Sequence, residues 1–485
     1  MSLLTYREEV LAAQSLRLAK YEDTGRIYEI EADSFPADEK APLEGIVMRQ
    51  KEASDFFYVY EDKNNGDIIG YVNGTCTTSP VITHESFERH EPEGSTLVVH
   101  SVTVQSSYRR MGNATFMLKS YLEKIKHMKS VTKVLLLCKI QLVKFYISCG
   151  FSFVGLSDVV HGEDPWYEMA HDLSHSRLLR QYQVDAFTTE PFRGNPAAVV
   201  LGMGSDEWMQ NMASENNLAE TAFIRPVLDD PRAPAMAVYD LRWFTPTVEV
   251  ELCGHATLST AHVLFEKGIV GSEKSNPIDT ICFRSKYRGE LIARRIFSGT
   301  NNSDWLVELD FPSSPPLESV VLETALLCEG LGINPVDVLY TGRAVDDLVI
   351  EVTPSAFRAI PSLKSGGIDF HKVASVHTRG VLVTCCGPLR RVCAVDGDNS
   401  KYEDEPEVDF ISRGFFPRYG INEDPVTGSA HCTLAPYWSQ KFACSSLVGF
   451  QQSQRGGWVR VRCEGDRVFL SGNSVTVQNS IILVG

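Results

Sequence analysis

Apolar positions in the first third of the chain are spaced partly as in helices and partly as in strands. Charged residues interrupt the apolar ones over residues 1–21, which predicts a helix, and the patterns that end at Pro36 and span 43–51 predict two more. Runs of β-forming residues at 56–60 and 68–72 flank the turn Asn64-Asn65-Gly66, which predicts an antiparallel pair of strands.

A strand, a basic glycine-containing turn and an amphipathic helix follow one another between residues 97 and 125. The strand is predicted over 97–104, and the turn contains Arg109, Arg110 and Gly112. Free N–H groups at a helix start attract anions, so the segment predicts a phosphate cradle, although any strand-turn-helix unit can carry Gly and Arg. The helix is indicated by apolar residues at helical spacing, namely Ala114, Met117, Leu118, Tyr121, Leu122 and Ile125.

Strand-like runs dominate beyond a polar junction, and we predict a domain boundary near residues 175–180. A strand-rich lobe with one main helix occurs twice, which predicts lobes at roughly 181–305 and 306–485. The predicted helices span 206–216, 258–267 and 434–442, and the strands span 182–187, 198–201, 221–224, 240–244, 305–311, 347–352, 380–385, 458–463 and 467–470.

One turn sequence occurs in both predicted lobes. Glu251-Leu252-Cys253-Gly254-His255-Ala256 is echoed by Pro425-Val426-Thr427-Gly428-Ser429-Ala430, each with a glycine between a strand end and a helical run. Each turn would present the free N–H groups of a helix start. Two such turns predict a pseudo-symmetric site that binds a ligand carboxylate between the lobes.

Composition narrows the class of protein. The chain has 485 residues, of which 43% are hydrophobic and 22% charged, as in soluble globular proteins with more than one domain. Its net charge of -16 argues against nucleic acid as a partner. The sequence has no apolar run of membrane-spanning length, and its 12 cysteines show no zinc-type spacing. We therefore expect a cytoplasmic protein without a membrane span, structural disulfides or a metal.

Residues 25–172 resemble the GNAT acetyltransferases. Arg109, Gly112 and Ala114 match the family's acetyl-CoA signature, and Phe145-Tyr146 with Gly150-Phe151 matches its late element. Segments 34–39, 99–104 and 142–146 are most similar to the arylalkylamine (serotonin-type) branch. The resemblance implies an acetyltransferase domain over residues 1–175, with a mixed central sheet flanked by helices, acetyl-CoA as cofactor and a primary amine as substrate.

This resemblance also implies roles for single residues. His100 would take a proton from the amine, and Tyr146 would protonate the leaving thiolate. Val98 stands where vertebrate-type members have a second histidine, a departure that bears on the proton relay and on the substrate. The alternative is that His100 is a core histidine and Tyr146 a packing residue. The cofactor would be bound by Val102, Val104, Arg109, Arg110, Met111, Gly112, Asn113 and Ala114.

Residues 181–485 resemble the PhzF family, named for phenazine biosynthesis. The match runs through Asp185-Ala186-Phe187-Thr188, Arg193-Gly194-Asn195-Pro196, Leu218-Ala219-Glu220-Thr221 and both echoing turns. The resemblance implies the α+β, two-lobed fold of diaminopimelate epimerase, in which each lobe is a small barrel of strands around a central helix. It further implies a homodimer and cofactor-free proton chemistry on a small carboxylate-bearing metabolite.

In the isomerase that defines this family, the glutamate that matches Glu220 moves a hydrogen between carbons, so the resemblance implies that Glu220 is the proton shuttle. A carboxylate enclosed between two lobes has a raised pKa, and helix starts beside it would stabilise developing negative charge. The further catalytic positions implied by the resemblance are His255, Asp424 and Ser429. The implied substrate-binding positions are Asn195, Gly254 and Gly428.

Other functions stay open for residues 181–485. A racemase or epimerase of this fold uses two opposed thiols, but the second turn has Thr427 where the first has Cys253. Further alternatives are a domain that only binds a metabolite or drives dimerisation, and an interaction scaffold with two decayed sites. The favoured hypothesis is a bifunctional enzyme that acetylates a primary (aryl)alkylamine and isomerises a small carboxylate-bearing metabolite.

Overall fold

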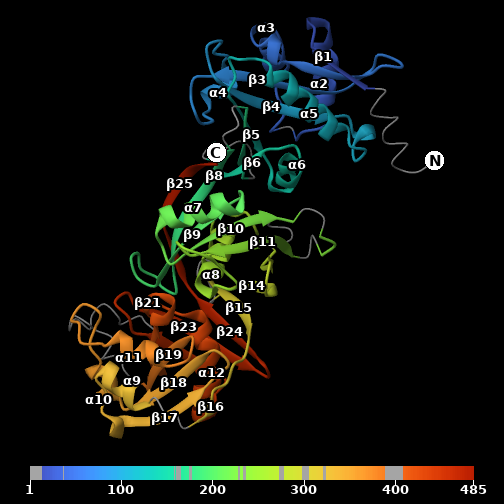
Figure 1. Ribbon diagram of the computed structural model, residues 1–485. Coiled ribbons are helices and arrows are strands. Elements are labelled where there is room, and N and C mark those ends of the chain that lie inside the picture. The colour runs from blue at the N-terminus through green and yellow to red at the C-terminus, as the bar shows by residue number, and fades with distance from the viewer. Residues whose placement is uncertain are drawn as a thin grey trace. The chain divides into compact units, whose positions relative to one another are not determined.

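The computed structural model describes residues 14–484 except for 37, 158, 160–164, 174–176, 228–229, 233–235, 272–277, 298–304, 320–323 and 388–407. The chain divides into two compact units (Figure 1). Unit 1 comprises Met1–Arg180 with Ile481–Gly485, and unit 2 comprises Gln181–Ser480. Within the described ranges, no helix is both long and apolar enough to cross a membrane.

Unit 1 is built on a seven-stranded sheet of order β1-β2-β3-β4-β5-β7-β6. Neighbouring strands pair antiparallel, except that β4 and β5 are parallel. The strands are β1 (Gln14–Leu18), β2 (Tyr58–Asp62), β3 (Ile68–Thr77), β4 (Thr96–Val104), β5 (Lys133–Cys138), β6 (Ser152–Leu156) and β7 (Tyr167–Asp172).

Helices cover both faces of this sheet. On one face, Gly70 of β3 approaches Met117 of α5. On the opposite face the next residue, Tyr71, donates its hydroxyl hydrogen to Glu31 of α2, as the alternation of strand side chains requires. The helices are α2 (Thr24–Ala32), α3 (Leu43–Glu52), α4 (Glu85–Glu88), α5 (Asn113–Lys126) and α6 (Val143–Ser148).

The helix predicted over residues 1–21 is wrong where the structure describes that segment, because residues Gln14–Leu18 form strand β1. Residues 1–13 lie outside the described ranges. Arg17 bonds to Glu61 across the strand pair at 2.7 Å, so this charged residue of the predicted helix belongs to an edge strand. The predicted helix at 43–51 and the strand at 97–104 are confirmed.

Unit 2 contains two successions of strands that are paired in the same order. In the first, β9 and β10 are parallel, β10 and β11 antiparallel, β11 and β13 parallel, and β14 and β15 continue antiparallel. The second repeats this order with β18, β19, β20, β22, β23 and β24. The two successions join through β15 and β24, and the whole set of strands closes on itself.

The first half of unit 2 contains the strands of the first succession together with β8 and β12. These strands are β8 (Arg177–Ala186), β9 (Asn195–Leu201), β10 (Glu220–Pro226), β11 (Ala237–Phe244), β12 (Glu249–Val250), β13 (Thr280–Ser285), β14 (Gly289–Phe297) and β15 (Trp305–Pro312). The others are β16 (Leu317–Glu318), β17 (Val338–Arg343), β18 (Asp347–Val352), β19 (Gly380–Cys386), β20 (Phe410–Phe416), β21 (Ile421–Asp424), β22 (Ser446–Gln451), β23 (Gly457–Glu464), β24 (Arg467–Gly472) and β25 (Ser474–Val484).

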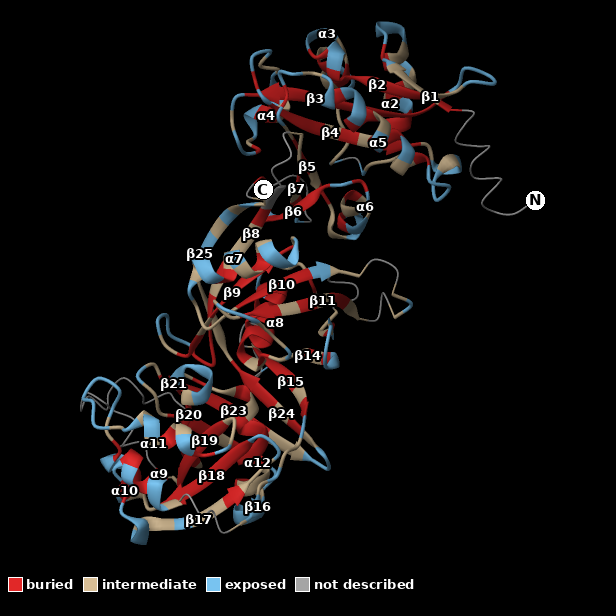
Figure 2. Ribbon diagram, viewed as in Figure 1, coloured by how far each residue is buried: buried red, intermediate tan, exposed pale blue. Residues whose placement is uncertain are grey.

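Helices α8 (Gly254–Glu266) and α12 (Gly428–Phe442) take equivalent places in the two successions, before β13 and β22. Both begin at the glycine of an echoing turn. Every residue of α8 from His255 to Phe265 is buried, which marks a central helix (Figure 2). The other helices of unit 2 are α7 (Asp206–Asn216), α9 (Thr324–Leu331), α10 (Pro354–Ala359) and α11 (Phe370–Ser375).

Candidate active sites

In unit 1, strands β4 and β5 stop pairing before β4 ends. Their ladder runs from Thr96 and Lys133 to Val99 and Leu136, whereas β4 continues to Val104 with β3 alone as its described partner. Val102 and Val104 therefore lie on a stretch of β4 with one hydrogen-bonding edge open. An extended ligand with amide groups fits such an edge, because it can pair there as a strand does.

His100 lies at the start of this open stretch, on a β-bulge. Asn73 of β3 pairs with Ser101, and Gly74 pairs with Val99, so His100 is the extra residue of β4. Its Nε2 lies 2.7 Å from the Thr75 hydroxyl, whose own hydrogen is donated to the Ser86 carbonyl at 2.7 Å. Nε2 must therefore carry the hydrogen, which leaves a lone pair on the buried Nδ1, an atom without a partner among the described residues.

The surroundings of His100 keep its imidazole neutral. Burial lowers its pKa well below the ordinary value, and the positive charge of Arg49 lowers it further. The ring packs edge-on against Phe87 with 4.9 Å between ring centres. His100 is thus both packed in the interior and equipped with an unused proton acceptor at neutral pH.

Tyr146 lies on α6 and is 6% exposed. Its ring makes edge contacts with Phe145 and Phe151. Burial raises the pKa of its phenol, so Tyr146 keeps its proton at neutral pH and can serve only as an acid there. Tyr146 therefore packs in the apolar interior and also retains a transferable proton.

The turn before α5 presents backbone groups more than side chains. Gly112 starts the helix with φ of 90°, and the space where its Cβ would lie is open. Arg110 is also left-handed, with φ of 63°. The first N–H groups of α5 have no side-chain cap at the helix start, so they are available for an anion such as a pyrophosphate.

Two predicted cofactor residues of this turn use their side chains within the protein. Arg109 donates to the Val104 carbonyl at 2.7 Å and to the Ser34 hydroxyl at 2.8 Å, which fixes the turn against the end of β4. The Asn113 amide accepts from the Tyr60 hydroxyl at 3.1 Å and donates to the backbone. Arg110, Met111 and Ala114 complete the turn, with the first two exposed.

In unit 2, the starts of α8 and α12 meet at their glycines. A Cβ on Gly254 would lie 3.5 Å from the Cα of Gly428 and 4.0 Å from the backbone nitrogen of Ser429. Neither helix has a side-chain cap at its start. Unsatisfied N–H groups of two helices therefore converge on one place, which suits a carboxylate.

Glu220, His255 and Cys253 form a continuous row beside these helix starts. His255 Nε2 lies 3.1 Å from Glu220 Oε2, and His255 Nδ1 lies 3.4 Å from Cys253 Sγ. Neither Nε2 nor Oε2 is aligned for a hydrogen bond within the described chain, although both atoms are buried. Each atom can therefore bind a ligand while the two stay close as an ion pair.

The same three residues offer atoms within 4.8 Å of one another that are of the types that bind metals. However, the thiol faces one nitrogen of the imidazole and the carboxylate faces the other. A metal ion would take only one nitrogen of this ring, and it would displace the contact that this nitrogen makes with its neighbour. The set fits a row of proton-transfer groups better than a metal centre.

Charge in this row favours the cationic form of His255. Burial by itself lowers its pKa, but Cys253 and Glu220 raise it well above the ordinary value. Burial and the negative charge of Glu220 raise the pKa of Cys253 to about 11, so the thiol stays protonated at neutral pH. The site thus holds a positive imidazolium next to the carboxylate of Glu220.

Asp424 is fixed on the far side of the site by amide and hydroxyl donors. Asn195 Nδ2 donates to Asp424 Oδ1 at 3.0 Å, and the Thr427 hydroxyl donates to Oδ2. Burial raises the pKa of Asp424 to about 6, with His255 opposing and Glu220 adding to the shift. These interactions bring Asn195, Glu220, His255 and Asp424 into one site, and Ser429 lies in the adjoining first turn of α12.

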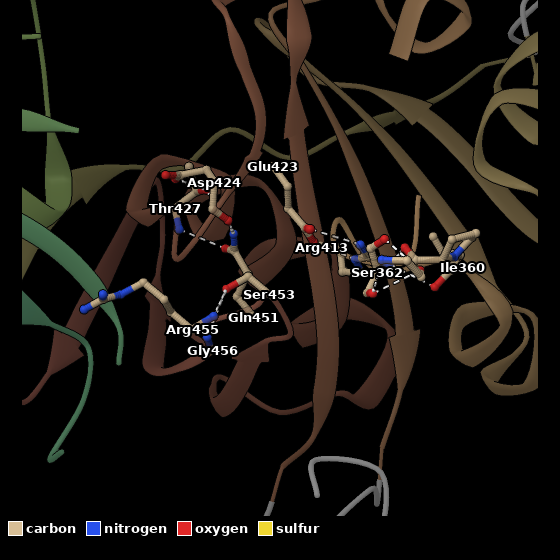
Figure 3. A network of polar contacts seen from close by, with 12 residues as sticks. Ile360, Ser362, Arg413, Glu423, Asp424, Thr427, Gln451, Ser453, Arg455 and Gly456 are labelled. Carbon is tan, nitrogen blue, oxygen red and sulfur yellow. Dashed lines mark hydrogen bonds and ion pairs between the residues drawn. The ribbon is translucent and has the colours of Figure 1, made fainter. Parts of the chain in front are cut away.

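Residues that the sequence did not single out support Asp424 (Figure 3). Gln451 of β22 donates to the Asp424 carbonyl at 2.8 Å and accepts from the Thr427 backbone at 2.8 Å. Glu423, the preceding residue, forms a buried ion pair with Arg413 at 2.6 Å. Gln451 lies in an ordinary strand pattern, so no motif in the sequence indicates its role. Glu423 and Asp424 are neighbours in one strand, and this could have indicated that their side chains point to opposite faces of it.

Comparisons with known proteins follow the division into two units. The model of the phenazine biosynthesis-like protein family matches residues 184–480, and the GNAT acetyltransferase family model matches residues 24–151. An uncharacterized isomerase of Halalkalibacterium halodurans is 42% identical over 305 residues, covering 62% of this chain and 98% of that protein. The phenazine biosynthesis-like domain-containing protein of Homo sapiens is 36% identical over 300 residues, covering 60% and 95%.

Among solved structures, a phenazine biosynthesis protein of the PhzF family from Enterococcus faecalis is similar to this chain. It has 32% sequence identity and a TM-score of 0.49, and the match covers 63% of this chain and 99% of that one.

Proposed function

The chain belongs to the phenazine biosynthesis-like protein family and carries a GNAT acetyltransferase domain as well, and on this premise we propose a bifunctional enzyme. Unit 1 transfers an acetyl group to a primary amine, and unit 2, which has the diaminopimelate-epimerase-like fold, isomerises a small carboxylate-bearing metabolite. The observation that carries the first activity is the unused lone pair of His100. The observation that carries the second is the pairing of Glu220 with His255 at two helix starts.

The acetyl transfer uses His100 as base and Tyr146 as acid. A GNAT domain uses acetyl-CoA or another acyl-CoA, which when bound supplies the acetyl thioester. The open edge of β4 and the uncapped start of α5 suit the extended amide chain and the pyrophosphate of that molecule. His100 Nδ1 accepts the proton that the amine loses as its nitrogen attacks, and the Tyr146 hydroxyl protonates the departing sulfur. Arylalkylamines are the first substrate class to test.

The isomerisation uses Glu220 to move one proton between two carbon atoms of the substrate. Glu220 removes the proton from one carbon, and the electron pair shifts toward the substrate's unsaturated system. Glu220 then returns the proton to the second carbon, so atoms and charge balance without an added cofactor. The helix starts at Gly254 and Gly428 hold the substrate carboxylate, and His255 as a cation stabilises negative charge in the intermediate.

Deuterium incorporation tests the isomerase activity. In heavy water, the wild-type chain should introduce deuterium into a cyclic or 2-amino carboxylic acid substrate, as followed by proton NMR. Glu220→Gln should lower this rate by roughly 10² to 10⁴. Glu215→Gln, an exposed glutamate on α7, is the matched control and should exchange as the wild type does. Equal exchange, or none, in wild type and Glu220→Gln would leave unit 2 with a binding role.

Acetyl-CoA binding tests the activity of unit 1. Calorimetry on the full chain should detect a single site, and the release of free thiol should require both acetyl-CoA and an amine such as tryptamine or phenethylamine. If the chain fails to bind acetyl-CoA, unit 1 is not an acetyltransferase.

The proposal extends to the architecture of the enzyme. The functional domains are residues 1–175 and 181–485, with one strand barrel around α8 and a second around α12, and the active form is a homodimer that acts on small molecules. Sedimentation of the purified chain would return the monomer mass if the dimer is wrong.

A further inference from the structure

Unpartnered polar atoms gather on one face of the unit 1 sheet. Arg49 is 8% exposed, Asn73 is 0% and Thr103 is 3%. The described structure offers no hydrogen-bond partner for Arg49 Nε and Nη1, for either polar atom of the Asn73 amide, for Thr103 Oγ1 or for His100 Nδ1. Buried polar groups are nearly always hydrogen-bonded, so a cluster of exceptions points to a ligand.

Strand register places these atoms together. Asn73 pairs with Ser101, and Tyr71 pairs with Thr103. These four strand residues alternate onto one face of the sheet, and Tyr71 shows that it is the face covered by α2. Arg49 lies on α3, which packs against α2 and β3 on this face, and its charge acts on His100. The cluster therefore adjoins the nitrogen that accepts the proton of the amine in the proposed acetyl transfer.

No hydrogen bond or ion pair of the Arg49 side chain is found among the described residues. Glu31, whose charge acts on Arg49, already accepts hydrogen bonds from the Tyr71 hydroxyl and from the Ala41 backbone at 2.9 Å. A buried guanidinium is costly unless an anion pairs with its N–H groups. A carboxylate is the anion that matches its planar donors best.

We propose that the amine acetylated by unit 1 also carries a carboxylate, as an aromatic α-amino acid does, and that Arg49 binds this carboxylate. The Asn73 amide and the Thr103 hydroxyl bond to the same polar end of the molecule, and His100 Nδ1 faces its amine. A simple arylalkylammonium brings a second positive charge beside Arg49 and leaves the guanidinium unpaired. This inference rests on the acetyl-transfer function proposed above.

Matched pairs of acceptors test the assignment on the full chain. Tryptophan with tryptamine and phenylalanine with phenethylamine differ within each pair only in the carboxylate. The wild type should favour the acid of each pair in kcat/KM by about tenfold or more. In Arg49→Gln, the KM of the acid should rise roughly 10- to 100-fold, because hydrogen bonds to a charged group are lost, while that of the amine changes little. Lys51→Gln, which removes an exposed charge from the same helix, should match the wild type.

Equilibrium binding separates this inference from the acetyl transfer itself. Calorimetry with the same pairs on the wild-type chain needs neither turnover nor a stable Arg49 variant, and the acids should bind more tightly than the amines. Amines that bind or react as well as the acids would overturn the role of Arg49. Acid-selective binding by a chain that releases no thiol from acetyl-CoA would instead contradict the acetyl-transfer function.

Discussion

Two histidines with buried nitrogens stand in the two candidate sites, and their surroundings shift their pKa values in opposite directions. The pKa of His100 is lowered by burial and by Arg49, whereas that of His255 is raised by Cys253 and Glu220 against the effect of burial. Burial is common to both, so the sign of the neighbouring charge decides the outcome. One residue type thereby yields a neutral base in unit 1 and a cation in unit 2.

The largest loss of activity is expected from removal of His100 in unit 1. His100→Gln keeps a hydrogen-bonding side chain but loses the basic nitrogen, so kcat for acetyl transfer should fall roughly 10²- to 10⁴-fold. Thiol release under saturating acetyl-CoA measures the loss. His127→Gln, an exposed histidine after α5, is the control. Deuterium exchange by unit 2 should stay unchanged, and an equal loss in both activities would show that His100 acts only through folding.

A methyl group at the helix starts should disturb unit 2 next most strongly. In Gly254→Ala, the new Cβ lies 3.5 Å from the Gly428 Cα, which is an ordinary contact but occupies the space proposed for the substrate carboxylate. Deuterium exchange should fall about tenfold or more, because small misplacements in a site are costly. The melting temperature should hold or rise slightly, since alanine favours helices by roughly 0.5–1 kcal/mol over glycine. Gly25→Ala, whose Cβ meets nothing within 4 Å, is the control.

The stability of the protein should depend on pH in opposite ways through His100 and His255. The pKa of His100 is lower in the folded chain than in the unfolded one, where it is about 6.5. His100 therefore contributes its full stability above about pH 6.5, and the contribution weakens as pH falls below that value. The pKa of His255 is higher in the folded chain than in the unfolded one. Its contribution to stability is therefore full below about pH 6.5, and it weakens as pH rises above that value.

Thermal melts of wild type, His100→Gln and His255→Gln across this range measure the two trends. The difference from wild type should grow with rising pH for His100→Gln and with falling pH for His255→Gln. If the melting temperatures of the two variants changed with pH in the same way, the opposite pKa shifts of His100 and His255 would be contradicted.

The smallest effect should come from the hydroxyl that fixes the tautomer of His100. Thr75→Val removes the acceptor for Nε2 and the donor to the Ser86 carbonyl, which should cost about 1 kcal/mol of stability per lost hydrogen bond. The rate of acetyl transfer should fall only a few-fold, because Nδ1 keeps its lone pair in one of the two tautomers. Thr132→Val loses only an exposed hydrogen bond of 3.3 Å to the Ser95 carbonyl, so it should cost less stability and leave the rate of acetyl transfer unchanged.

Regular elements and glycine turns were predictable from the sequence. The glycines of the echoing turns begin α8 and α12 as the pattern indicated, and the apolar spacing of residues 114–125 marks α5. Such features depend on local backbone preferences, which a single sequence displays. The strand at Gln14–Leu18 was missed because its partner is strand β2, where Glu61 bonds to Arg17 from far along the chain, and no local pattern reveals that pairing.

Features set by strand register were not predictable either. The bulge at His100 depends on how Asn73 and Gly74 pair across two strands, and Arg49 joins that site from a helix that shows no unusual spacing. Cys253 was noted only for the thiol missing opposite it, whereas the structure gives it a contact with His255. In each instance, tertiary packing supplies the neighbour that changes the chemistry.

The open edge of β4 beyond Val99 ties the folding of unit 1 to supply of its cofactor. A molecule that pairs with this edge binds the folded chain and not the unfolded one. Its binding therefore raises the free energy of unfolding by an amount that grows with its concentration. At a hundred times its dissociation constant, the added stability is about 2.7 kcal/mol. The lifetime of the protein against proteolysis should therefore rise and fall with the acyl-CoA level of the cell.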